Sequence, residues 1–205
     1  MPTNIIHLIT FTINHLSFTI NKEMLDLKKI DKSWTLFLDR DGVINHEKYQ
    51  DYVHTWEEFV FYDGVKDAIK IFAARFKYII IITNQKGVGK GLTKLENLHI
   101  IHDNMRNEVE AAGGKIDKVY FCPDLDETSS NRKPNPGMGL QAVKDFRDID
   151  LTKAIMVGNT ISDMEFGRNL GVNTIFLPTT RPEVSLTDKR IDASYNSLLD
   201  FAKAL

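Results

Sequence analysis

The chain has 205 residues, of which 42% are hydrophobic and 26% charged, and its formal net charge is -2. This composition is typical of a folded globular protein and excludes a fibre or a chain that is disordered throughout. Because 26 basic residues are offset by 28 acidic ones, no broad positive field exists, and we expect no nucleic-acid partner. The single cysteine, Cys122, excludes an internal disulfide and suits a reducing, cytoplasmic compartment.

Residues 1–33 are expected to form an N-terminal extension outside the core. Residues 5–20 are apolar, but no basic segment precedes them and no small-residue cleavage site follows. They are also too short to span a bilayer, which takes about 20 residues. We therefore expect neither export nor a membrane partner. A polar stretch opens at Met24, and we expect translation to start there. Residues 34–205 are expected to form a single domain.

From Trp34 onward, short β-branched and aromatic runs alternate with longer amphipathic segments, as in βαβ units. Strands are expected at 35–38, 78–83, 118–121, 154–157 and 174–177. Helices are expected at 65–75, 93–112, 137–146, 162–170 and 197–204. This order predicts an α/β fold, a three-layer Rossmann-like sandwich with a mainly parallel sheet and no large cap domain. The long irregular segments 45–62 and 122–136 are expected to shape a site.

Four polar clusters follow predicted strands, and ligands of doubly wound sheets bind at the C-terminal edge of the strands. The clusters are Asp39–Val43, Thr83–Gln85, Arg132–Pro134 and Gly158–Asp163. Asp39 and Asp41 are two positions apart after a strand, so their carboxylates can face the same way. One carboxylate can then act as a nucleophile while the other moves protons, both beside a divalent cation.

Two other interpretations fit these motifs less well. Calcium loops also contain D-x-D-G, but they need glycine at the sixth position, whereas Gly42 is the fourth residue counted from Asp39. The segment KGVGKGL is similar to a nucleotide phosphate loop, which needs glycine at position 84 and Ser or Thr at position 91. The chain has Asn84 and Gly91 there. Its glycines are expected to let the backbone turn closely around the site.

Together and in this order, the four clusters resemble those of the haloacid dehalogenase superfamily of phosphatases and phosphotransferases. The resemblance covers about residues 35–177 and is close at FLDRDGVIN, DYVHTWEEF, FYDGV, TNQKGVGKG, RKPNPGM and VGNTISDMEFGRN. These strings are similar to the subfamily of D-glycero-D-manno-heptose 1,7-bisphosphate 7-phosphatase and histidinol-phosphate phosphatase. The resemblance implies a Mg2+-dependent phosphatase that forms an aspartyl-phosphate.

The resemblance also implies a role for each matching residue. Asp39 would be the nucleophile, and Asp41 the acid/base that protonates the leaving alkoxide and later activates water. Thr83 would bind the transferring phosphoryl group, and Lys133 would neutralise charge on it and on Asp39. These roles fit phosphoryl transfer, in which positioning and charge neutralisation supply most of the catalysis.

The metal and substrate positions follow in the same way. Mg2+ would lie between Asp39, the backbone carbonyl of Asp41 and Asn159, with Asp163 positioning the metal's water or Lys133. The substrate-contacting positions are Asn84, Gln85, Arg132 and Tyr52, the last in an insert, residues 47–52, that would help to choose the leaving group. The expected partner is a small phosphorylated sugar, and the protein is expected to be a monomer.

The chain departs from the family pattern in two places, one residue and one loop. The family usually has Asp where this chain has Asn159, so we expect Mg2+ to bind more weakly without being lost. Many subfamily members hold zinc through a Cys-x-His and a Cys-x-Cys before Arg132, but the matching residues here are Cys122, Asp124, Ser129 and Asn131. One thiolate cannot make such a site, so we expect no zinc and a buried, apolar Cys122.

The pair His99 and His102, one helical turn apart, is expected to lie on an ordinary helix face and not to bind a metal. Three functions remain open. The first is hydrolysis of the 7-phosphate of a heptose bisphosphate, in making precursors of bacterial surface polysaccharide such as lipopolysaccharide. The second is hydrolysis of histidinol phosphate, which the acidic residues of the 47–51 segment would favour. The third is a phosphosugar-binding protein whose chemistry has weakened through Asn159, against which the intact catalytic residues argue.

Overall fold

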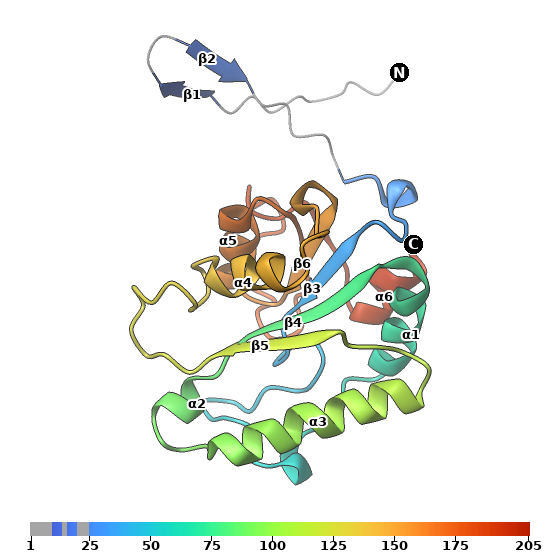
Figure 1. Ribbon diagram of the computed structural model, residues 1–205, viewed down its shortest axis with the longest axis vertical. Helices are drawn as coiled ribbons and strands as arrows, with labels where there is room; N and C mark the ends of the chain where they lie inside the picture. Colours follow the sequence, from blue (N-terminus) through green and yellow to red (C-terminus); the bar gives the residue numbers. More distant parts are fainter. Residues whose placement is uncertain (1–9, 14–15, 20–24) are drawn as a thin grey trace.

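The computed structural model describes residues 10–13, 16–19 and 25–205, and its main body is a parallel β-sheet covered by helices on both faces (Figure 1). The sheet has six strands in the order β5-β4-β3-β6-β7-β8, and every neighbouring pair is parallel. The strands are β3 (Thr35–Leu38), β4 (Tyr78–Asn84), β5 (Lys118–Cys122), β6 (Ala154–Gly158), β7 (Asn173–Phe176) and β8 (Ala193–Ser194). The predicted α/β sandwich is confirmed, and the two-residue β8 is a strand too short for its sequence to show.

The helices form the two outer layers of the sandwich. One face is covered by α1 (Val65–Arg75), α3 (Leu95–Ala111) and α6 (Leu198–Lys203), and the other by α4 (Gly137–Asp145) and α5 (Ile161–Leu170). The short helix α2 (Lys86–Gly89) follows β4. Single 3-10 turns occur at Leu27–Lys29, Trp56–Glu58 and Leu151–Lys153. All five predicted helices are present, and their ends lie within two residues of the predicted ones.

The central strands are apolar on both faces, which explains their continuous hydrophobic sequences. In β3, Leu36 and Leu38 pack into the core on the α1 side, whereas Phe37 packs into the core on the α5 side. In β4, the odd-numbered Ile79 points to the first core and the even-numbered Ile80 to the second. This alternation follows from the two-residue period of a strand, and burial of both faces is typical of parallel sheets.

The N-terminal part of the chain contains a small sheet of its own and a few residues that pack against the core. Strands β1 (Thr10–Ile13) and β2 (Leu16–Thr19) pair as a separate antiparallel sheet. The expected translation start at Met24 lies outside the described residues. The core begins earlier than residue 34, because Ile30 is buried in it and Leu25 packs against it. The residues just before β3 therefore supply apolar contacts to the core.

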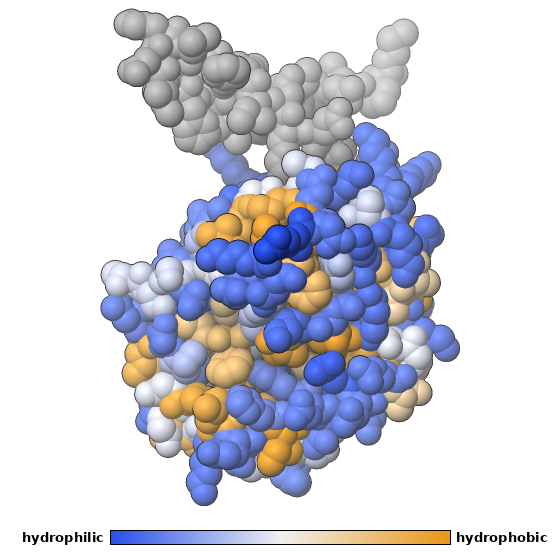
Figure 2. Space-filling view, in the orientation of Figure 1, coloured by the Kyte–Doolittle hydropathy of each residue, from blue (hydrophilic) through white to orange (hydrophobic). Residues whose placement is uncertain are grey.

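One face of the main body is largely polar. Figure 2 shows hydrophilic residues over most of the face that it presents, with apolar residues in smaller patches between them. None of the helices among the residues that the structure describes is long and apolar enough to cross a membrane.

The register of the sheet brings distant polar residues together. Leu38, the last residue of β3, lies beside Ile81 of β4 and Val157 of β6. Because the three strands run in the same direction, the residues that follow them meet at one edge of the sheet. The long segments 45–62 and 122–136 also lie at this edge, where they frame the residues described next.

Candidate active site

A buried lysine joins two carboxylates at the C-terminal edge of the sheet. The ammonium nitrogen of Lys133 lies 2.8 Å from Oδ1 of Asp39 and 2.6 Å from Oδ1 of Asp163. It also donates a hydrogen bond of 2.9 Å to the carbonyl of Ile82. Asp39 follows β3, Asp163 lies in the first turn of α5, and Lys133 comes from the loop after β5. Three segments far apart in the sequence therefore form one charged cluster.

The electrostatics of this cluster follow from burial and from the neighbouring charges. Burial raises the pKa of Asp39 to about 7, and Lys133 acts in the opposite direction. Burial would lower the pKa of Lys133, but the charges of Asp163 and Asp39 outweigh it, so the pKa of Lys133 lies above its usual value. The lysine therefore stays cationic and partly neutralises the negative charge around Asp39.

A set of hydrogen-bond donors surrounds the second carboxylate. Nη2 of Arg40 contacts both oxygens of Asp41, at 2.8 and 2.9 Å, while Asn45 and Gln85 each donate one hydrogen bond of 2.9 Å. Burial would raise the pKa of Asp41, but the charge of Arg40 and these hydrogen bonds outweigh it, and the pKa lies below its usual value. Asp41 is therefore ionised and held in one orientation.

The turn that carries both carboxylates is tight. The N–H groups of Val43, Ile44 and Asn45 all donate to the carbonyl of Arg40. Gly42 has a φ of 82°, and a Cβ there would lie 2.0 Å from Nδ2 of Asn159. Glycine is needed at this position because the backbone is left-handed and passes too close to Asn159 for a side chain.

The residues after β4 position the other groups. Oγ1 of Thr83 is buried and accepts a hydrogen bond of 2.9 Å from Gln85. The amide of Asn84 makes two hydrogen bonds of 3.0 Å with the backbone of Lys133, donating to its carbonyl and accepting from its N–H. The TNQ sequence thus fixes the loop that carries Lys133 and one side of the Asp41 carboxylate.

Asn159 offers an oxygen suited to a metal ion. The side chain is fully buried, and its Nδ2 donates a hydrogen bond of 2.6 Å to Thr180. Its Oδ1 is buried and has no hydrogen-bond partner among the residues that the structure describes. A buried oxygen without a donor is costly unless a ligand satisfies it, and hard cations such as Mg2+ prefer oxygen ligands. The residues here therefore fit a divalent cation.

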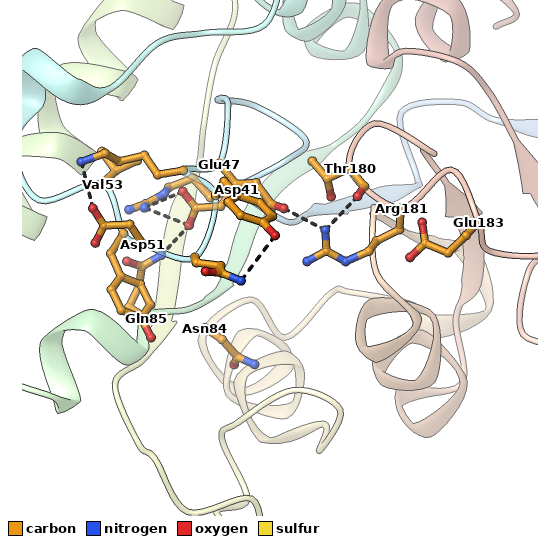
Figure 3. Close-up of a pocket in the computed structure, with 14 residues that line it drawn as sticks. Asp41, Glu47, Asp51, Val53, Asn84, Gln85, Thr180, Arg181 and Glu183 are labelled. Carbon is orange, nitrogen blue, oxygen red and sulfur yellow. Dashed lines mark hydrogen bonds and ion pairs between the residues drawn. The ribbon is translucent and has the colours of Figure 1, made fainter.

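A pocket of about 590 Å³ opens beside Asp41 (Figure 3). It is lined by Arg40, Asp41, Glu47, Lys48, Tyr49, Gln50, Asp51, Tyr52, Val53, Asn84, Gln85, Thr180, Arg181 and Glu183. Three predicted substrate-contacting residues, Asn84, Gln85 and Tyr52, are in this wall. Arg132 is not; its guanidinium is buried and donates to the carbonyl of Asp124 at 3.2 Å, which holds the loop.

The sequence interpretation missed one side of the pocket. Thr180, Arg181 and Glu183 come from the loop after β7, and Nη1 of Arg181 lies 3.0 Å from Oε1 of Glu47 in the insert. The signal was available, because TTRPE follows a predicted strand at the same edge of the sheet as the other clusters. The ion pair between Arg181 and Glu47 links the insert to the loop after β7.

His102 lies on the buried face of α3, beside a polar partner. It is 6% exposed, and its Nε2 lies 3.1 Å from Nη1 of Arg40. His99, one turn earlier on α3, is exposed, and its ring contacts the ring of Phe121. The sequence did not indicate this contact, because Arg40 lies in the turn after β3, far from His102 in the chain.

The loop at 122–136 is held by hydrogen bonds. Cys122 is buried in the apolar core on the α4 side, which confirms its predicted place. The hydroxyl of Ser129 donates to Asp124, and Asn135 donates to the carbonyls of Glu127 and Ser129. Among the described residues, no three His, Cys, Asp or Glu side chains are grouped so that they could hold a metal ion.

Because Lys133 is buried between two carboxylates, Asp163→Asn should lower the free energy of unfolding by about 3 kcal/mol. The matched control is Thr160→Ala, which removes only the helix cap that Thr160 and Asp163 share and should cost about 1 kcal/mol. Urea unfolding followed by circular dichroism measures both. Equal losses would mean that the cap, and not the ion pair, accounts for the effect.

We also expect the purified protein to contain no stoichiometric zinc, because only one of the four positions that would hold it carries a thiol. Elemental analysis after chelation and dialysis measures the metal content. One zinc ion per chain would contradict this prediction.

Comparisons with known proteins agree with this geometry. A family model described as "Polynucleotide kinase 3 phosphatase" matches residues 31–196. A D-glycero-alpha-D-manno-heptose-1,7-bisphosphate 7-phosphatase of Mycobacterium bovis is 34% identical over 84% of this chain and 91% of its own length. One of the same name from Campylobacter jejuni is 41% identical over 71% of this chain and 83% of its own length.

Solved structures agree as well. The crystal structure of D,D-heptose 1,7-bisphosphate phosphatase from B. bronchiseptica, complexed with magnesium and phosphate, is similar with a TM-score of 0.74 and 27% identity. The match covers 83% of this chain and 97% of that one. The chain therefore belongs to the haloacid dehalogenase-like phosphatases, in the family whose model is described as polynucleotide kinase 3 phosphatase.

Proposed function

We propose that this phosphatase removes the 7-phosphate of D-glycero-D-manno-heptose 1,7-bisphosphate, using Mg2+ and an aspartyl-phosphate formed on Asp39. The observation that carries the proposal is the pairing of Asp39 with Lys133 at 2.8 Å, beside an Asp41 that lines the pocket. The heptose bisphosphate substrate is supported by the relatives from Mycobacterium bovis and Campylobacter jejuni, because both are named heptose-1,7-bisphosphate 7-phosphatase and the chain spans most of their length.

In the first step, a carboxylate oxygen of Asp39 attacks the phosphorus, and the bond from phosphorus to the sugar oxygen breaks. Asp41 gives its proton to the departing sugar oxygen. The donors around Asp41 favour its ionised form, but the negative charge of a bound phosphate opposes them and favours the protonated form that the step requires. Lys133 neutralises charge on the phosphoryl oxygens and on Asp39.

In the second step, Asp41 takes a proton from a water molecule, which attacks the phosphorus of the aspartyl-phosphate and releases inorganic phosphate. Asp39 is then free as a carboxylate, so the cycle is closed. Thr83 is proposed to bind the transferring group through its hydroxyl, which Gln85 orients. Both steps use fixed groups at the end of the sheet, which is the main requirement of phosphoryl transfer.

The proposed ligands of Mg2+ are Asp39, the backbone carbonyl of Asp41 and Oδ1 of Asn159. The unpartnered Oδ1 supports this assignment, as does the magnesium named for the similar structure from B. bronchiseptica. Bound Mg2+ would neutralise charge that accumulates on the phosphoryl oxygens. Asp163 is proposed not to contact the metal itself but to hold Lys133 beside Asp39.

The pocket supports a small polar substrate. Its volume of about 590 Å³ is within the usual range for small ligands. Its cations are matched by acids, since Lys48 pairs with Asp51 and Glu58 and Arg181 pairs with Glu47. We therefore propose no polynucleotide substrate, despite the description of the family model, because these paired cations leave no basic surface in the pocket to follow a phosphate backbone. We also propose a monomeric, cytoplasmic enzyme.

Histidinol phosphate is the second candidate. The acidic residues Glu47, Asp51 and Glu183 line the pocket and would favour a cationic leaving group. Two of them already pair with cations, Glu47 with Arg181 and Asp51 with Lys48, which makes this candidate weaker than the sugar bisphosphate. A binding protein without activity is weaker still, because the Asp39–Lys133 pair and Asp41 are complete.

Wild-type protein with Mg2+ is expected to release phosphate rapidly from one or both anomers of the heptose 1,7-bisphosphate, and Asp39→Asn is expected to lose this activity by at least about 1000-fold. Phosphate release from these substrates, fructose 1,6-bisphosphate and histidinol phosphate measures the preference. Faster turnover of histidinol phosphate would replace the proposed substrate but keep the mechanism. Turnover that survives in Asp39→Asn would contradict the mechanism itself.

Asn159→Asp should lower the Mg2+ concentration needed for half-maximal activity by about tenfold, because a carboxylate adds a unit of charge to the metal site. A titration of activity against Mg2+ in both proteins tests this. Thr180→Val is the matched control, because it removes the hydrogen bond to Nδ2 of Asn159 without adding charge. An equal or higher Mg2+ requirement in Asn159→Asp would show that residue 159 is not a ligand.

A further inference from the structure

Arg40 connects the proposed acid/base to a buried histidine on another element. Its guanidinium is fully buried, with Nη2 on both oxygens of Asp41 and Nη1 at 3.1 Å from Nε2 of His102. Its Nε has no hydrogen-bond partner among the residues that the structure describes. The orientation of the guanidinium is therefore fixed at two ends, by Asp41 on the pocket side and by His102 on the α3 side.

The chemistry of the contact determines the state of the histidine. Arginine only donates hydrogen bonds, so Nε2 of His102 accepts, and the ring proton is on Nδ1. Burial, together with the charge of Arg40, lowers the pKa of His102 to about 3. The ring is therefore neutral throughout the physiological range and can act as a lasting acceptor for Arg40.

We propose that His102 is a positioning residue for catalysis, which orients the carboxylate of Asp41 through the guanidinium of Arg40. The inference rests on the proposed function, in which Asp41 transfers the proton to the leaving group. Without the acceptor on α3, Nη1 of Arg40 loses its partner, and the guanidinium can rotate away from the carboxylate. Asp41 would then keep only the single hydrogen bonds from Asn45 and Gln85.

The proposal predicts an effect that depends on the leaving group. A sugar alkoxide is a poor leaving group and needs the proton of Asp41, whereas p-nitrophenolate leaves without one. A variant that misplaces Asp41 therefore slows the first step for a sugar phosphate but not for p-nitrophenyl phosphate. A variant that damages the structure in general slows both. The ratio of kcat/KM for the two substrates separates the two cases, because kcat/KM reports the steps up to the first irreversible one.

The experiment compares His102→Leu with wild type on the heptose bisphosphate and on p-nitrophenyl phosphate. We expect His102→Leu to lower kcat/KM for the sugar phosphate by about tenfold or more, and that for the aryl phosphate by less than about threefold. His102→Gln, whose amide oxygen can accept from Arg40, should recover most of the loss. His99→Leu is the matched control, because His99 lies one turn away on α3 and is exposed. Its kcat/KM values for both substrates should stay at those of wild type.

A second variant covers the case in which His102→Leu does not fold. Arg40→Lys keeps the cation but replaces Nη1, which contacts His102, and Nη2, which contacts Asp41, by a single ammonium nitrogen, and it should show the same selective loss on the sugar phosphate. Equal losses on both substrates, or no loss on either, would overturn the inference alone. If wild type shows no Asp39-dependent turnover of either substrate, the proposed function fails and the inference fails with it.

Discussion

The ammonium group of Lys133 lies buried between Asp39 and Asp163, and the arrangement of the site depends on this contact. Removing a charge from water costs several kcal/mol unless partners replace the lost hydration. Here three acceptors do so, two carboxylates and the carbonyl of Ile82. They belong to β4, to α5 and to the turn after β3, so they meet only when the three central strands are in register. Fold and site are thus coupled through one cation.

Two carboxylates two residues apart are placed in opposite electrostatic environments. Burial raises the pKa of Asp39, while Arg40 and two amides lower the pKa of Asp41. These directions are opposite to those that the proposed roles need, since a nucleophile needs a low pKa and an acid a high one, so bound Mg2+ beside Asp39 and bound phosphate beside Asp41 would have to reverse them. The difference here comes from position 40 and its buried guanidinium, which connects Asp41 to α3. The turn after β3 therefore contains the proposed nucleophile, the proposed acid/base and the residue that distinguishes them.

The segments that frame the pocket are anchored to the sheet at several points. Arg181 ties the insert to the loop after β7, and His54, just after the insert, contacts Thr93, just before α3, at 2.8 Å. The loop that carries Lys133 is fixed by Asn84 and by hydrogen bonds around Asn135. These contacts hold the pocket wall and the loop of Lys133 in place from segments outside the Asp39–Lys133–Asp163 cluster.

The sequence by itself determined the fold class and the five main strands and helices, and it predicted, from the clusters after the strands and from the family resemblance, that Asp39, Asp41, Thr83, Lys133 and Asn159 share one site. These follow from local signals, since apolar runs of period 2 and 3.6 predict elements and polar residues after parallel strands share an edge. Only the tertiary structure decided that His102 faces Arg40, that Arg132 holds a loop outside the pocket, and that Arg181 pairs with Glu47. Those outcomes depend on which side chains meet across elements, and no local pattern in the chain encodes that.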